Sequence, residues 1–147
     1  MTKNIFATVL LILALATWGI ATASENIPQL PRTLANARFI YVAAYDGDQF
    51  DFRLLPEDRT AIARVQEAIQ KWGKLTLVYR RQDADIILMV QSRPSEDVLA
   101  VYDAHSGDAH SEPSQNYLWR VMGRGGLQKS EIPLFSQFEK AWDKITN

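Results

Sequence analysis

After residue 38 the hydrophobic residues occur in two patterns, short continuous runs and a spacing of three or four, and these patterns predict strands and helices. The longest apolar run outside the N-terminus covers residues 86–90 and follows Asp83 and Asp85. A short apolar run bounded by polar turns is typical of a buried strand. Four shorter runs, rich in β-branched and aromatic residues, predict further strands. In chain order the five expected strands cover residues 38–45, 75–79, 85–91, 98–102 and 117–122.

Two other segments repeat their apolar residues every three or four positions, which predicts amphipathic helices. The first runs from Pro56, which suits the first helical position, to Trp72, and Gly73 is expected to end it. The second runs from about Pro133 to Ile145. Its apolar face consists of Leu134, Phe135, Phe138, Ala141, Trp142 and Ile145.

The order of these elements predicts an α+β fold: a single mixed, mainly antiparallel five-stranded sheet with two amphipathic helices packed on it. We expect both helices on the same face and the first and third strands at the centre of the sheet. Trp72, Trp119 and Trp142, together with Phe135 and Phe138, have the spacing of core aromatics. A binding groove lined by these rings is the alternative interpretation.

The N-terminal residues have the pattern of a secretory signal peptide. Lys3 precedes an almost wholly apolar stretch, and Ala21-Thr22-Ala23 provides small residues for cleavage. An uncleaved membrane anchor is the alternative, but the apolar stretch is shorter than the roughly 20 residues of a spanning helix. We expect residues 1–23 to be removed, residues 24–37 to form a flexible linker around Pro28 and Pro31, and residues 38–147 to form a single domain.

Composition limits the classes of function that are open to the domain. The chain has 147 residues, a net charge of −1 and no cysteine. Loss of Lys3 makes the mature domain slightly more acidic, which argues against nucleic acid as a partner. The absence of cysteine excludes thiol catalysis, thiolate metal sites and disulfides. We therefore expect a periplasmic or secreted protein that meets the membrane only through its signal peptide.

The best candidate for a metal site is a short polar loop. Asp103, His105, Asp108 and His110 bring both histidines and two carboxylates together. Imidazole and carboxylate groups are ligands for zinc and other divalent ions. These four residues therefore predict either a metal site, and with it a small metal-dependent hydrolase, or a solvated turn in which aspartate and histidine are common.

A second acidic segment partly matches a calcium-binding loop. Asp46, Asp48 and Glu57 occupy the first, third and twelfth positions of such a loop. Phe50 stands where an oxygen ligand is needed, and Asp51 stands where glycine makes the turn. A plain strand-to-helix connection is the favoured interpretation.

Two further groups of charged residues have structural interpretations. Asp83 and Asp85 have the spacing of a carboxylate pair on one face of a strand, but no catalytic partner is identifiable and turn residues are the favoured interpretation. A basic edge is formed by Lys74, Arg80, Arg81 and Arg93. It serves either to prevent edge-to-edge aggregation or to bind anionic envelope polymers or lipid head groups. No nucleophile elbow or phosphate loop is present, so we assign no catalytic residue and no cofactor.

Several short stretches resemble those of small bacterial envelope domains. They are Lys71-Trp72-Gly73, Ala84 to Val90, Leu99 to Asp103 and Leu118-Trp119-Arg120. This pattern is similar to the amino-terminal domain of TolB and to families of envelope lipoproteins of unknown function, although the lipoproteins' anchoring cysteine is missing. The resemblance covers about Phe39 to Ile145 and implies a helix-covered sheet without catalytic residues. It implies a binding or assembly role in the cell envelope, with another envelope protein as the expected partner.

Overall fold

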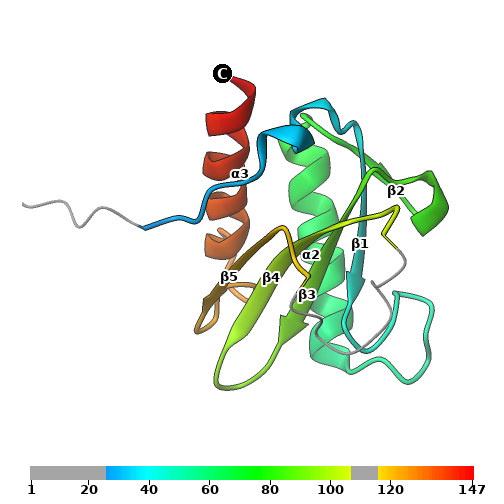
Figure 1. Cartoon of the computed structure of the whole chain (residues 1–147). Coiled ribbons are helices and arrows are strands. Elements are labelled where there is room, and N and C mark those ends of the chain that lie inside the picture. Colours follow the sequence, from blue (N-terminus) through cyan, green and yellow to red (C-terminus); the bar gives the residue numbers. More distant parts are fainter. Residues whose placement is uncertain (1–25, 107–115) are drawn as a thin grey trace, which may run out of the picture.

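The computed structural model describes residues 26–106 and 116–147 and shows one mixed five-stranded sheet with two long helices (Figure 1). The strands are β1 (Phe39–Ala44), β2 (Thr76–Val78), β3 (Ile86–Ser92), β4 (Asp97–Asp103) and β5 (Trp119–Gly123). The helices are α2 (Pro56–Trp72) and α3 (Pro133–Thr146), with short 3₁₀ helices η1 (Arg32–Asn36) and η2 (Arg81–Asp83). Both long helices lie behind the sheet in Figure 1 and share one core cluster. The predicted α+β class and the common helix face are confirmed.

The strand order across the sheet is β2-β1-β3-β4-β5. The central position predicted for the first and third strands is confirmed. β1 pairs in parallel with β2 and β3, whereas β3, β4 and β5 pair antiparallel. The sheet is therefore mixed, as predicted, with parallel pairing around β1 and antiparallel pairing from β3 to β5. The parallel pairing of β2 and β3 with β1 arises because α2, and then the connection that contains η2, each return the chain to the end of the sheet where β1 begins.

The ends of α2 follow directly from local chemistry. Pro56 occupies the first helical turn, and Glu57 and Asp58 place negative charge there, where the helix dipole favours it. Gly73 has a φ of 71°, the left-handed conformation that glycine adopts without strain, and its N–H donates to the Ile69 carbonyl. The predicted helix is confirmed at both ends.

Aromatic side chains fill the core between the helices and the sheet. Phe138 of α3 is fully buried, and its ring centroid lies 5.8 Å from those of Trp72, Trp119 and Trp142. Trp119 and Trp142 are almost fully buried, and Trp72 packs against the same cluster. Trp119 and Trp142 are therefore core residues, whereas Trp72 is partly buried and lines, with Phe135, a pocket of about 660 Å³ beside α2 and α3. Burial of each large apolar side chain contributes about 2 kcal/mol of hydrophobic free energy.

The segment before β1 differs from the predicted flexible linker over its described part, 26–37. Leu30 and Leu34 are 3% and 8% exposed and belong to the helix-side core. The indole Nε1–H of Trp119 donates to the Pro28 carbonyl at 2.9 Å. Pro28 lies before the 3₁₀ helix η1 and Pro31 directly precedes it, so the segment covers the core without forming a long helix. The predicted signal peptide lies outside the described residues.

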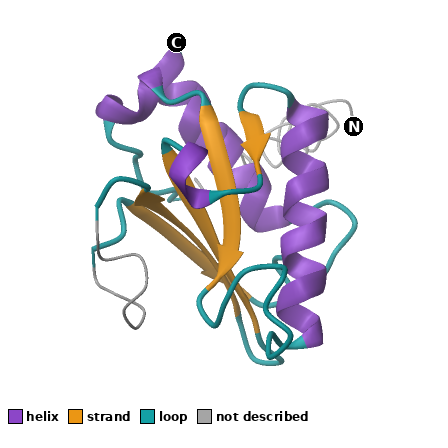
Figure 2. Cartoon of the chain, turned by 90° about the vertical axis from the view of Figure 1, so that its right-hand side faces the viewer, coloured by secondary structure: helices purple, strands orange, loops and turns teal. Residues whose placement is uncertain are grey.

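The opposite face of the sheet carries a second, smaller core cluster. Its centre consists of Tyr41 and Ala43 of β1, Ile87 and Met89 of β3, and Ala100 and Tyr102 of β4. The η2 segment crosses β1 on this side, so that Ala84 joins the same cluster. Figure 2 shows the molecule from the β2 edge of the sheet. In this view α2 lies on the face opposite to this second cluster. We call the face that carries this cluster the open face, because neither long helix covers it.

Within the described residues, no helix combines the length and the apolar character that crossing a bilayer requires.

Candidate functional site

The predicted metal site lies only partly within the described residues. Asp108 and His110 are outside them. The Oδ1 atom of Asp103 accepts a hydrogen bond from the His105 backbone N–H at 2.9 Å, and the Asp103 carbonyl accepts one from the Ser106 hydroxyl. This is the chemistry of an aspartate turn. Over 26–106 and 116–147, no three potential ligand side chains come together. The metal site therefore stays a prediction.

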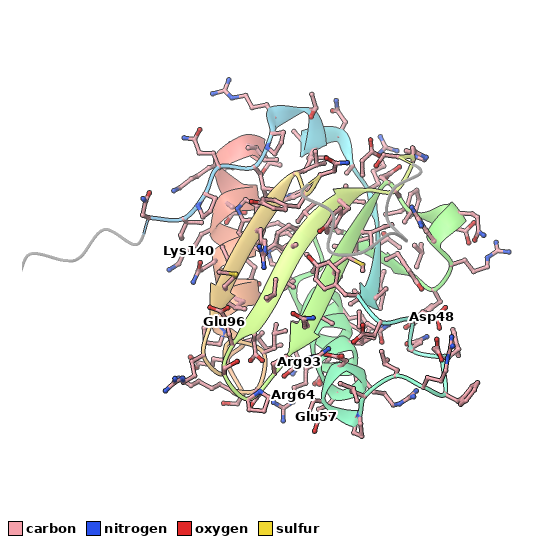
Figure 3. All side chains as sticks on the ribbon, turned by 60° about the horizontal axis from the view of Figure 1, so that its bottom comes forward. Asp48, Glu57, Arg64, Arg93, Glu96 and Lys140 are labelled. Carbon is pink, nitrogen blue, oxygen red and sulfur yellow. The ribbon has the colours of Figure 1, made fainter. Side chains whose placement is uncertain are left out.

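The acidic residues of the calcium-like segment have protein partners. Asp46 forms an ion pair with Arg93 at 2.7 Å. Oδ1 of Asp48 accepts a hydrogen bond from the Phe50 N–H at 2.8 Å. Figure 3 labels Asp48 and Arg93. The Asp51 carboxylate accepts hydrogen bonds from the guanidinium and from the backbone N–H of Arg53, and these hydrogen bonds lower the pKa of Asp51. The segment is a strand-to-helix connection, as favoured from the sequence.

Asp83 and Asp85 are turn residues that do not face one another. Both oxygens of Asp83 accept hydrogen bonds from Arg80, at 2.7 and 3.1 Å, within the η2 segment. Asp85 instead accepts the backbone N–H groups of Arg38 and Phe39, at 2.7 and 3.0 Å. The hydrogen bond from Arg38 is the main cause that lowers the pKa of Asp85. Asp85 therefore fixes the start of β1 and is not a proton donor.

Three of the four cations of the predicted basic edge form ion pairs. Lys74 forms an ion pair with Asp143, Arg80 pairs with Asp83, and Arg93 pairs with Asp58. Arg81 donates to the Ser106 carbonyl at 3.2 Å. Because three of these four cations already have acidic partners, the edge offers a polyanion little net positive charge.

A buried polar network, missed from the sequence, connects three parts of the chain. The Ser92 hydroxyl lies 2.8 Å from Oδ1 of Asp97, whose Oδ2 accepts the Leu127 N–H at 2.9 Å. Asp58 of α2 accepts the Ser92 N–H at 2.7 Å and the Arg93 guanidinium. The two aspartates are 1% or less exposed. Since each carboxylate is satisfied by structural donors, the network joins α2, the β3–β4 hairpin and the segment before α3.

The open face holds a cavity of about 460 Å³. Its apolar wall is formed by Tyr41, Tyr45, Ile87 and Met89, and Phe50 and Tyr79 lie at its exposed margin. Its polar lining consists of Asp48, of Arg80 directly before η2, and of Arg81 and Gln82 in η2. We call this the open-face cavity. Its volume lies within the range of small-molecule sites.

The tyrosine hydroxyls around the cavity are held in their neutral form. Burial is the main cause that raises the pKa of Tyr41 to about 12, with the charge of Asp48 as the second cause. Burial also raises the pKa of Tyr45, whose hydroxyl lies 3.0 Å from that of Tyr102. Both Tyr41 and Tyr45 therefore stay hydrogen-bond donors at neutral pH.

The β1–α2 loop, residues 45–55, presents apolar side chains to solvent. Phe50 is 73% exposed, Phe52 89% and Leu55 44%. Large apolar side chains exposed close together along the chain are less common on a protein surface than isolated ones. No short motif in the sequence signals this surface, because only the folded loop shows which side chains leave the core.

Comparisons of the chain with protein-family models, with curated proteins and with solved structures gave no match.

Proposed function

We propose that the protein is an exported, non-catalytic binding or assembly module of the cell envelope. The observation that carries this proposal is the β1–α2 loop, which presents Phe50, Phe52 and Leu55 outward. Large aromatic side chains dominate the free energy of protein–protein contacts when a partner pocket covers them. The signal-like N-terminus supports export, and the resemblance to envelope domains supports the compartment.

The loop is held in one conformation by its own polar groups. The Arg59 guanidinium donates to the carbonyls of Gln49 and Asp51, at 2.6 and 2.8 Å. Asp48 accepts the Phe50 N–H, and Leu54, only 4% exposed, anchors the loop in the helix-side core. A loop that is already ordered loses little conformational entropy when it binds. The exposed rings are therefore presented as preformed anchors.

The polar groups nearby favour binding over catalysis. Asp83, Asp85, Asp58 and Asp97 all accept hydrogen bonds from structural donors. A general acid or base needs a titratable group within reach of a substrate. The open-face cavity offers Asp48 and Arg81 but no histidine among its described lining residues.

Site-specific photo-crosslinking tests the proposed contact in the native host. A photoreactive phenylalanine analogue at position 52 should give a discrete adduct of higher mass, because this ring is expected to enter a partner. The matched control is the same analogue at Phe39, which is 41% exposed at the start of β1. Absence of an adduct at position 52, or the same adducts from both positions, would contradict the proposal.

Mass spectrometry of the protein recovered from the same cells tests export. The mature chain should begin at Ser24 and be found in the periplasmic or extracellular fraction. A full-length chain in the cytosolic fraction would contradict this part of the proposal.

A further inference from the structure

The open-face cavity has a lining that is both aromatic and polar, and of the three residues of the proposed partner contact only Phe50 lines it. Of its aromatic residues, Tyr41 belongs to β1, Tyr45 and Phe50 belong to the β1–α2 loop, and Tyr79 directly follows β2. Its inner wall includes Ile87 and Met89, which are 1% and 6% exposed. A ligand in the cavity would therefore contact aromatic rings beside a fixed apolar sheet surface.

The polar groups of the cavity supply donors and acceptors. Asp48 offers a carboxylate, Gln82 an amide, and Tyr41 a hydroxyl that stays protonated. A purely apolar ligand would remove these groups from water without replacing their hydrogen bonds, which costs free energy. The lining therefore favours a ligand that carries several hydroxyl or amide groups.

The charges of the described lining residues are balanced. Arg80 is neutralised by Asp83 at 2.7 Å, which leaves one anion, Asp48, and one cation, Arg81. Arg81 is already tied to the Ser106 carbonyl. A strongly charged ligand would find no net opposite charge to offset its desolvation. The balance therefore favours a neutral ligand over an anion, and Arg81 opposes a cation.

We propose that the open-face cavity binds a neutral saccharide unit. A sugar ring has an apolar C–H surface, which packs on rings such as Tyr79 and Phe50, and a rim of hydroxyls, which the polar side chains can bond. The volume of about 460 Å³ suits one or two rings of an oligosaccharide. The exposed margin at Phe50 and Tyr79 allows the remainder of the oligosaccharide to continue into solvent.

The test is a titration of the ¹⁵N-labelled mature protein, followed by NMR. The probes are an N-acetylglucosamine tetramer, maltotetraose and choline chloride. At least one oligosaccharide should bind with a Kd below about 1 mM. Its shifts should be concentrated at the residues that line the cavity. Choline should cause no comparable shifts, because Arg81 disfavours a cation there.

Three variants connect the binding to the cavity. Tyr79→Ala should weaken the affinity about tenfold by removing a stacking ring. Tyr41→Phe should weaken it about fivefold, because the ring remains and only the hydroxyl is lost. Phe39→Ala should leave the affinity unchanged, since Phe39 is similarly exposed to solvent but does not line the cavity. Circular dichroism checks that all three variants fold.

Three results would overturn the proposal. They are binding of choline without either oligosaccharide, absence of shifts with both oligosaccharides at about 10 mM, and equal affinities for Tyr79→Ala and Phe39→Ala in folded protein. None of them bears on the crosslink at Phe52, which does not line the cavity. Failure of the saccharide site and failure of the partner contact are therefore distinguishable.

Discussion

Single carboxylates in this protein have structural tasks that their sequence neighbours do not reveal. Asp85 accepts two backbone N–H groups of the segment that starts β1. Asp97 accepts the Leu127 N–H, 30 residues further along the chain. In both residues a charged carboxylate, instead of a backbone carbonyl, accepts the hydrogen bonds of these backbone N–H groups. Hydrogen bonds to a charged acceptor are stronger than those between neutral groups.

The lowered pKa of Asp85 predicts a pH dependence of stability. A carboxyl whose pKa is lower in the folded state stabilises the fold at pH values above its unfolded pKa, about 3.9. This contribution is lost as the pH falls through the folded-state pKa. Asp85→Asn removes the charge but keeps an acceptor oxygen, so its cost at pH 7 should be small. The difference between the urea midpoints of wild type and variant should narrow from pH 7 to pH 2.5.

The comparison needs a variant that lacks the backbone contacts. Asp83→Asn serves this purpose. In the described structure the Asp83 carboxylate accepts hydrogen bonds from the exposed side chain of Arg80 and from no backbone group. A difference for Asp85→Asn that does not change with pH would show that its charge does not contribute as argued.

At the scale of elements, β3 connects the two faces of the molecule. Leu88 belongs to the helix-side core, whereas Ile87 belongs to the open-face cluster. The strand pairs with β1 on one side and with β4 on the other. An apolar run on both faces is expected of a strand at such a position.

A charge in the middle of β3 should therefore prevent folding. Ile87→Asp would place an unpaired carboxylate at a position that is 1% exposed, at a cost of about 4 kcal/mol or more. Far-ultraviolet circular dichroism at neutral pH should show loss of structure. Met122→Asp is the matched control on β5, where the side chain is 48% exposed, and it should fold. A wild-type spectrum and melting curve for Ile87→Asp would refute the role of β3.

Elements with local signals were predictable, whereas their partners were not. Pro56 and Gly73 set the ends of α2 by backbone chemistry alone. The parallel pairing of β2 with β1 depends on which side of β1 the returning chain reaches, and no residue of Thr76–Val78 encodes that. Asp58 lies in the first turn of α2, where the helix dipole favours a negative charge, but its burial depends on the distant residues Ser92 and Arg93.

At the scale of the whole molecule, the two faces of the sheet differ in what covers them. The helix side is closed by α2, by α3 and by the packed segment 26–37. The open face is lined by the β1–α2 loop and the η2 segment, which leave the cavity between them. The cavity could not be predicted, because it depends on Tyr41 of β1 and Tyr79 after β2 lining the same space. The α+β class could be predicted, because it follows from the periodicity of each segment.

The segment 26–37 should behave as part of the folded domain. The double variant Leu30→Ala, Leu34→Ala removes two core side chains and should lower the free energy of unfolding by about 4 kcal/mol or more. Urea denaturation monitored by circular dichroism measures the loss. Gln29→Ala with Arg32→Ala changes exposed side chains of the same segment and should cost less than about 1 kcal/mol. Equal losses for the two double variants would mean that the segment is not anchored by its leucines.

The separation of aromatic residues between the two faces gives the protein two native optical probes. Trp72, Trp119 and Trp142 lie in the helix-side core, whereas Tyr41, Tyr45, Tyr79 and Tyr102 lie on or beside the open face. Tryptophan emission should therefore report on the packing of the helices, and tyrosine emission or quenching on events at the cavity. A ligand in the cavity can thus be followed without a label, while the tryptophan signal shows in the same sample whether the fold is intact.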